Sequence, residues 1–253
     1  GAHIIGITGS PGSGKSTLVD VLAREMRADG RTVAILAIAP SSHLTGGAVL
    51  GDRVRMSSHS QDPGIFIRSM GTRGSTTGLA RAARDAVKVL DAAGYDVVIV
   101  ETVGGGQVEL DVLTVADTVA VVLVPGLGDT MQMNKAGIME IGDLFVVNMA
   151  DRPETPAFVR DLKQALAIGA RHADMPPVCR TVAISGEGVG ELWAALSVVA
   201  NSRTASCAGT SRAGSWQCCV RRWRAHPHST TSADACTTAT SPRGVPRPNG
   251  CPP

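Results

Sequence analysis

The stretch that decides the fold of this chain reads Gly9-Ser10-Pro11-Gly12-Ser13-Gly14-Lys15-Ser16-Thr17. An apolar, strand-like run at His3–Thr8 precedes it, and a helical pattern at Lys15–Arg27 follows it. The glycines let the backbone curl until several peptide N–H groups face one point, toward which the helix directs its positive end. A Gly-x-x-x-x-Gly-Lys-Ser motif between a strand and a helix predicts a P-loop, which cradles nucleotide phosphates.

Each polar side chain of this loop has an expected task. Lys15 can reach the β- and γ-phosphates, and the Ser16 hydroxyl can bind Mg²⁺. The residues expected to line the nucleotide site here are Gly9, Gly12, Ser13, Gly14, Lys15, Ser16 and Thr17. A glycine-rich turn formed by chance is the alternative, and both the motif and its context speak against it.

Outward from the loop, strand-like and helical patterns alternate. Further strands are expected at Val33–Ile38, Gly64–Met70, Asp96–Val100, Thr118–Val124, Leu144–Asn148 and Val178–Ile184. Helices are expected at Thr77–Ala93, Ala157–Ile168 and Glu191–Val199. Short apolar runs without polar alternation are typical of strands buried on both faces of a parallel sheet. We therefore expect an α/β P-loop NTPase domain over residues 1–200, with a mostly parallel sheet and helices on both faces.

Residues 201–253 differ in composition from the rest of the chain. They contain no Leu, Ile or Phe, and they hold seven Arg, one acid and five of the six cysteines. Such a segment cannot bury enough apolar surface to offset its ordering entropy, so we expect a basic low-complexity tail that is disordered or non-native. Its Cys and His residues match no common zinc spacing, and short arginine runs are more often solvated than bound to nucleic acid.

Charge and hydropathy exclude several classes of partner. The net charge of +2 resides in the tail, which leaves residues 1–200 mildly acidic and without the footprint of a nucleic-acid-binding domain. No run approaches the roughly 18 unbroken apolar residues of a membrane span. No secretory signal is visible, because the first apolar run belongs to the P-loop strand. We expect a cytoplasmic protein that binds neither nucleic acid nor membrane.

A second motif, Asn148-Met149-Ala150-Asp151, ends one of the expected strands. It is similar to the Asn-Lys-x-Asp signature of GTPases, with Met149 in place of Lys. The Asp151 carboxylate can accept hydrogen bonds from guanine N1–H and the 2-amino group, whereas adenine has no donor at either position. Asn148 can brace the loop or touch the base. The alternative is that Asn and Asp simply form a turn after the strand.

Two acids are candidates for a metal site. Glu101 follows the expected strand Asp96–Val100, where P-loop proteins keep an acid for Mg²⁺, and an acid that ends a buried strand usually has a partner. Asp52 lies in the long loop after the second expected strand. A solvated loop acid is the alternative for Asp52.

These blocks together resemble one family, the MeaB/ArgK-type GTPases, which include the human methylmalonic aciduria type A protein. The resemblance runs in order from about residue 1 to residue 200. Its blocks are Gly6–Gly9 with the P-loop, Pro40–Ser42, Thr45–Gly47, Leu50–Met56, Phe66–Arg68, Glu101–Gln107, Val124–Asp129, Asn148–Asp151 and Gly186–Gly188.

The resemblance implies a protein that binds GTP with Mg²⁺, hydrolyses it slowly and acts as a chaperone of adenosylcobalamin-dependent methylmalonyl-CoA mutase or a related mutase. The implied catalytic residues are Lys15, Asp52 and Glu101, and the implied metal ligands are Ser16, Asp52 and Glu101. Asn148 and Asp151 match the pair that reads the base of GTP or GDP, and Asp129–Lys135 matches a mobile segment that relays the nucleotide state. An older label ties the family to arginine/ornithine transport as an ATPase, and a module that binds nucleotide with impaired hydrolysis is a third reading.

The chain departs from the family pattern in three places. Ala39 stands where the family has an Asp that serves the Mg²⁺ and water network, and Met149 replaces the signature Lys. We find no stretch that matches the helical segment which the family has before the P-loop strand, and residues 201–253 do not resemble the helical arm through which the family dimerises. The last difference argues against carrying the family's homodimer over to this chain.

Placing a carboxylate at position 39 tests the effect of the first departure, Ala39 in place of Asp. Ala39→Asp should raise the Mg²⁺-dependent rate of GTP hydrolysis by about 10–100-fold, the usual effect of a residue that supports a metal site. Phosphate release is measured against Mg²⁺ concentration for both proteins. An unchanged rate would show that Ala39 does not limit the reaction.

Overall fold

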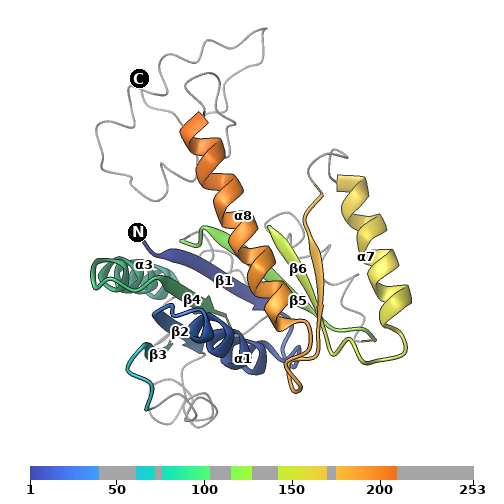
Figure 1. Ribbon diagram of the computed structural model, residues 1–253, viewed down its shortest axis with the longest axis horizontal. Coiled ribbons are helices and arrows are strands. Elements are labelled where there is room, and N and C mark those ends of the chain that lie inside the picture. Colours follow the sequence, from blue (N-terminus) through green and yellow to red (C-terminus); the bar gives the residue numbers. More distant parts are fainter. Residues whose placement is uncertain (40–60, 72–75, 103–114, 127–141, 170–174, 210–253) are drawn as a thin grey trace, which may run out of the picture. The chain divides into compact units, whose positions relative to one another are not determined.

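The computed structural model describes residues 1–39, 61–71, 76–102, 115–126, 142–169 and 175–209 (Figure 1). Contacts group the chain into two units, Gly1–Arg203 and Thr204–Pro253. Of the second unit, the structure describes the residues up to Gly209, which continue the last helix. The fold below is therefore that of the first unit.

A parallel sheet forms the centre of this unit. Its strands are β1 (His3–Gly9), β2 (Val33–Ala39), β3 (Ile65–Gly71), β4 (Val97–Glu101), β5 (Thr118–Leu123), β6 (Leu144–Asn148) and β7 (Val178–Thr181). They lie in the order β3-β2-β4-β1-β5-β6-β7, and every pairing is parallel. The described helices are α1 (Lys15–Ala28), α3 (Thr76–Ala92), α7 (Thr155–Gly169) and α8 (Val189–Gly209). The predicted α/β class and parallel sheet are confirmed.

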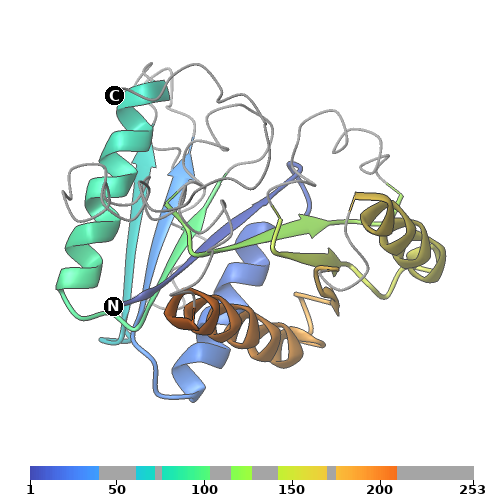
Figure 2. The ribbon, with the colours of Figure 1, turned by 90° about the horizontal axis from the view of Figure 1, so that it is seen from above.

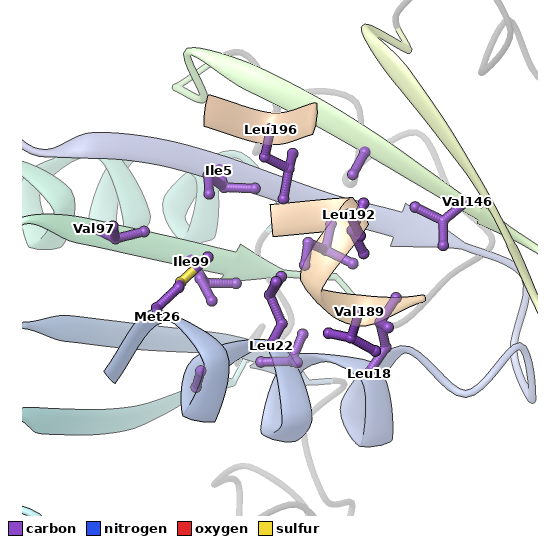
Figure 3. Close-up of a cluster of buried hydrophobic side chains, with 14 of the residues drawn as sticks. Ile5, Leu18, Leu22, Met26, Val97, Ile99, Val146, Val189, Leu192 and Leu196 are labelled. Atoms are coloured by element: carbon purple, nitrogen blue, oxygen red, sulfur yellow. The ribbon is translucent and has the colours of Figure 1, made fainter. Parts of the chain in front are cut away.

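Helices cover both faces of the sheet (Figure 2). On one face, α1 and α8 share a single core with the strands, and Leu22 and Leu192 point into it beside Ile99 (Figure 3). On the other face, α3 packs over β2 and β4, and α7 packs over β5 and β6. Because both faces are covered, every residue of β4 and of β6 is buried, which explains why these strands read as unbroken apolar runs.

The order of the strands reverses at β1. This strand lies between β4 and β5, so the chain leaves it toward one side of the sheet through α1 and β2 and reaches the other side through β5. In open parallel sheets, ligands bind at the carboxyl ends of the strands where the order reverses in this way. The loop Gly9–Gly14 begins at that point.

Two elements end more than one residue away from the end that the sequence predicted. The helix expected to stop at Val199 runs to Gly209, because residues 201–208 contain neither Gly nor Pro and Gly209 is the first helix breaker. Strand β7 ends at Thr181, because Val182 turns into an isolated antiparallel bridge with Glu187. The last helix thus continues into the first residues of the predicted tail, and residues 210–253 lie outside the described residues.

None of the helices in the described part of the chain combines the length and the hydropathy that a bilayer crossing requires.

Truncating one core residue of α8 tests whether this helix is part of the folded domain. Leu192 is 1% exposed, so Leu192→Ala should lower the free energy of unfolding by about 2–5 kcal/mol in urea denaturation. Val198→Ala on the same helix is the control; Val198 is 66% exposed, and the change should stay within about 0.5 kcal/mol. Equal effects of the two substitutions would contradict the placement of α8.

Candidate functional site

Two glycines of the P-loop occupy positions where a side chain would displace neighbouring atoms. Gly9 has φ +146°, and a Cβ there would lie 2.1 Å from the carbonyl oxygen of Val122 on the neighbouring strand β5. Gly14, the N-cap of α1, has φ +81°, and its Cβ would lie 2.5 Å from Nδ2 of Asn148. The loop can therefore approach both β5 and the end of β6 closely, because these positions lack side chains.

Lys15 lies at the first position of α1 and turns back across the loop. Its Nζ donates hydrogen bonds to the carbonyl oxygens of Gly9 and Ser10, both at 2.8 Å, and the residue is 6% exposed. A buried ammonium that is held by the loop's own carbonyl oxygens is suited to neutralising phosphate charge. Gly12 in the loop and Thr17 in the first turn of α1 are both exposed.

The structure brings together Ser16 and Glu101, although they are 85 residues apart in sequence. The Ser16 Oγ donates to Oε1 of Glu101 at 2.6 Å, and Glu101 is buried at the carboxyl end of β4. A hydroxyl and a carboxylate are the hard oxygen donors that Mg²⁺ prefers, so this pair fits a magnesium site next to the P-loop. Asp52, the other predicted acid, lies outside the described residues, as does the segment Asp129–Lys135.

Asn148 joins three segments of the site with its buried side chain. Its Nδ2 donates to the carbonyl oxygen of Ser13 in the P-loop at 2.9 Å. Its Oδ1 accepts from the Thr181 hydroxyl at 3.2 Å and from the Ala183 N–H at 3.1 Å. The sequence left open whether Asn148 braces the loop or touches the base. The structure shows that it braces the loop. The amide holds the P-loop against the loop that follows β7.

Ser13 contributes through its backbone. Its carbonyl accepts from Asn148, and its N–H donates to the Ser10 carbonyl at 3.2 Å. Its hydroxyl is buried and has no hydrogen-bond partner within the described residues. The side chain therefore packs inward and leaves the backbone to shape the phosphate cradle.

The loop Met149–Arg152 carries the predicted base-reading acid. Met149 has φ +55°, which is unfavourable for a residue with a Cβ, and its Cε lies 3.8 Å from the position of a Cβ on Gly14. The side chain thus reaches back to the end of the P-loop. Asp151 is exposed beyond it, where a planar base that extends from the phosphates could meet its carboxylate.

Sequence reasoning missed three residues of this arrangement, Thr181, Ala183 and Arg152. Thr181 is the buried last residue of β7, next to β6, and a polar residue at the end of a strand is a signal that could have been used. Arg152 donates from Nη1 to the Pro125 carbonyl oxygen at 2.9 Å. No local pattern reveals that contact, because it depends on the pairing of β5 with β6.

Cys179 on β7 is not a reactive group of this site. Burial raises the pKa of its thiol, and the negative charge of Glu191 raises that pKa further. The thiol therefore stays protonated at neutral pH and acts as a small apolar residue.

A matched pair of glycine substitutions tests the contact between the P-loop and Asn148. Gly14→Ala and Gly30→Ala place a Cβ at nearly the same φ, +81° and +77°, but at Gly30 no atom lies within 4 Å. Gly30→Ala should cost about 1–2 kcal/mol of stability and leave GDP affinity unchanged. Gly14→Ala should also displace the Asn148 amide and weaken GDP binding at least about 10-fold in calorimetric titration. Equal GDP affinities of the two variants would contradict the proposed brace.

Comparisons with known proteins identify the family of this chain. The sequence model of the family described as "Methylmalonyl Co-A mutase-associated GTPase MeaB" matches residues 1–225. A Pyrococcus horikoshii protein that carries the provisional name of GTPase is 54% identical over 196 residues, which are 76% of this chain and 62% of that protein. The mitochondrial methylmalonic aciduria type A homologue of Caenorhabditis elegans is 39% identical over 198 residues, 76% of this chain and 50% of that protein.

A solved structure shows the same architecture. The crystal structure of an LAO/AO transport system kinase superposes with a TM-score of 0.66 at 28% identity, over 94% of this chain and 71% of the other. The chain spans between half and about three fifths of the length of the two curated relatives named above. Since the family model covers most of the sequence and the relatives exceed 30% identity, the chain belongs to the MeaB family of P-loop proteins.

Proposed function

We propose that this chain is a GTP-binding switch protein that hydrolyses GTP slowly. One observation carries the proposal: the hydrogen bond of 2.9 Å between Asn148 and the Ser13 carbonyl joins the P-loop to the loop that carries Asp151. This bond supports the proposal that the P-loop and Asp151 serve one nucleotide site. The family to which the chain belongs is described as a GTPase, which supports the same conclusion.

Phosphoryl transfer to water depends on positioning and on neutralisation of charge. Lys15 and the N–H groups of the P-loop would hold the β- and γ-phosphates. Ser16 and Glu101 would hold Mg²⁺, with Asp52 as the third oxygen ligand that the resemblance implies. The bound metal would neutralise charge on the phosphate oxygens. Turnover is slow in P-loop proteins to which no arginine is supplied at the phosphates, so we expect an intrinsically slow hydrolase.

Guanine specificity would come from Asp151. A carboxylate accepts hydrogen bonds from both guanine N1–H and the 2-amino group, and it would remain unpaired against adenine. The methylene and methyl groups of Met149 can pack on the base, but the ammonium of the signature Lys is missing. We expect a weaker affinity than that of a site with Lys, with the preference for guanine retained.

The partner that we propose is an adenosylcobalamin-dependent mutase, methylmalonyl-CoA mutase or a related enzyme. The family description and the name of the Caenorhabditis elegans relative both support it. Gel filtration of the chain with methylmalonyl-CoA mutase, in the presence of GDP or a non-hydrolysable GTP analogue, tests this part. A nucleotide-dependent complex is expected, and separate elution in both nucleotide states would overturn the chaperone role.

A second candidate function is an ATPase accessory to amino-acid transport. The name of the solved structure, a transport system kinase, favours it. Competition between GDP and ADP for the site decides between the two, because Asp151 should exclude ADP. A third candidate, nucleotide binding with impaired hydrolysis, is separated from the first by single-turnover measurement of GTP cleavage.

Replacing the base-reading carboxylate tests the proposed specificity. Asp151→Asn should weaken GDP binding by about 100-fold or more, because two charge-assisted hydrogen bonds of about 1.5–3 kcal/mol each are lost. It should improve the binding of xanthosine diphosphate, whose 2-oxo group accepts from the new amide. The control is Asp161→Asn on α7, whose side chain is 68% exposed. Calorimetric titration with both nucleotides measures the effect, and a GDP affinity equal to that of the control would refute the role of Asp151.

A further inference from the structure

Two loops lie next to each other at the carboxyl edge of the sheet, one after β5 and one after β6. The strands pair in register up to Leu123 and Val147, so the residues that follow them leave the sheet side by side. The first loop contains Pro125 and Gly126, and the second is Met149–Arg152.

The side chain of Arg152 connects these two loops. Its Nη1 donates a hydrogen bond of 2.9 Å to the Pro125 carbonyl oxygen, across 27 residues of sequence. Gly126 has φ +90°, and the guanidinium lies 4.0 Å from the position that a Cβ would take there. A Cβ at that distance would make an ordinary van der Waals contact, so the positive φ of Gly126, and not the space beside Arg152, favours glycine at this position.

The second loop needs such support because its backbone is strained. Met149 adopts φ +55°, a left-handed conformation that persists in a residue with a Cβ when surrounding contacts enforce it. On one side, the Ala150 N–H donates to the Thr181 carbonyl of β7 at 3.0 Å. Within the loop, the Arg152 N–H closes a turn onto the Met149 carbonyl at 3.2 Å.

Asp151 stands between two tethered neighbours. Ala150 is fixed to β7 through its backbone, and Arg152 is fixed to the end of β5 through its side chain. The exposed carboxylate of Asp151 has no comparable support of its own in the described contacts. Its direction is therefore set by the residues before and after it, and Arg152 supplies the support on the β5 side.

We propose that Arg152 is a positioning residue for recognition of the base: its bond to Pro125 holds the strained loop so that the Asp151 carboxylate faces the guanine edge. This inference rests on the guanine specificity proposed above. Arg152 need not touch the nucleotide. It acts through the geometry of Asp151, so its loss should affect the nucleotides that use the carboxylate more than those that do not.

The experiment compares GDP with inosine diphosphate, which keeps the phosphates, the ribose and N1–H but lacks the 2-amino group. The variants are Arg152→Ala and Arg152→Met, the second of which keeps an apolar stem in case the first folds poorly. Arg152→Lys should restore a donor for the Pro125 carbonyl. The control is Arg160→Ala, because Arg160 is 75% exposed on α7. Dissociation constants are measured by calorimetric titration, together with the melting temperature of each ligand-free protein.

We expect Arg152→Ala and Arg152→Met to weaken GDP binding about 10-fold, the effect of one lost charged hydrogen bond. Inosine diphosphate should lose less affinity, so the preference for GDP falls toward unity, and Arg152→Lys should recover part of it. Arg160→Ala should leave the preference unchanged.

Two results would overturn the inference. The first leaves the proposed guanine specificity standing, and the second overturns that as well. If the unmodified chain prefers GDP and Arg152→Met keeps that preference while lowering the melting temperature, Arg152 has a structural role alone. If the unmodified chain does not distinguish GDP from inosine diphosphate or ADP, guanine specificity itself is wrong, and the inference is overturned with it.

Discussion

All strands of the sheet run in the same direction, and this constraint determines where the chemistry of the protein can lie. Each strand delivers the residues that follow it to one edge, so the P-loop after β1, Glu101 at the end of β4, Pro125 after β5 and Asn148 at the end of β6 meet there. Because β1 lies between β4 and β5, the P-loop is centred among them. The glycines then allow the backbone itself to form the cradle, with the N-terminus of α1 directed at the same point.

At the opposite edge of the sheet, where the strands begin, the same type of hydrogen bond occurs three times. Asp96, Asp117 and Asp143 each precede a strand and accept a hydrogen bond from the backbone N–H of Thr32, Ile4 and Val119, respectively, at 2.8–3.0 Å. Bonds from the backbone and hydroxyl of Thr32 lower the pKa of Asp96, and burial lowers the pKa of His3, whose Nε2 lies 3.0 Å from the Thr118 hydroxyl. The three carboxylates satisfy N–H groups at or next to the start of neighbouring strands, so the amino edge stabilises the sheet while the carboxyl edge remains available for ligands.

At the carboxyl edge, the Asn148 amide links the P-loop to β7 and to the segment that follows it. Its three hydrogen bonds reach the P-loop, the last residue of β7 and the segment after that strand, and Asn148 is 2% exposed. An amide at this depth would cost about 1–3 kcal/mol if its partners were lost, so the three segments are energetically linked. The strained backbone at Met149 and the tether from Arg152 extend this linkage to Asp151. The phosphate and base ends of a nucleotide would thus be held by one connected frame.

The sequence by itself determined the P-loop, the α/β class and the buried parallel strands, because hydrophobic periodicity and glycine spacing are local properties of the chain. It also located Glu101, Asn148 and Asp151 at the ends of strands. The end of α8 was predicted wrongly, since composition alone does not reveal that a helix can continue to the first glycine. The tertiary structure decided that Ser16 pairs with Glu101, that Asn148 binds Ser13 across 135 residues and that Arg152 reaches Pro125. These contacts depend on strand order and register, which arise from the packing of the whole sheet and leave no trace in the residues near each partner.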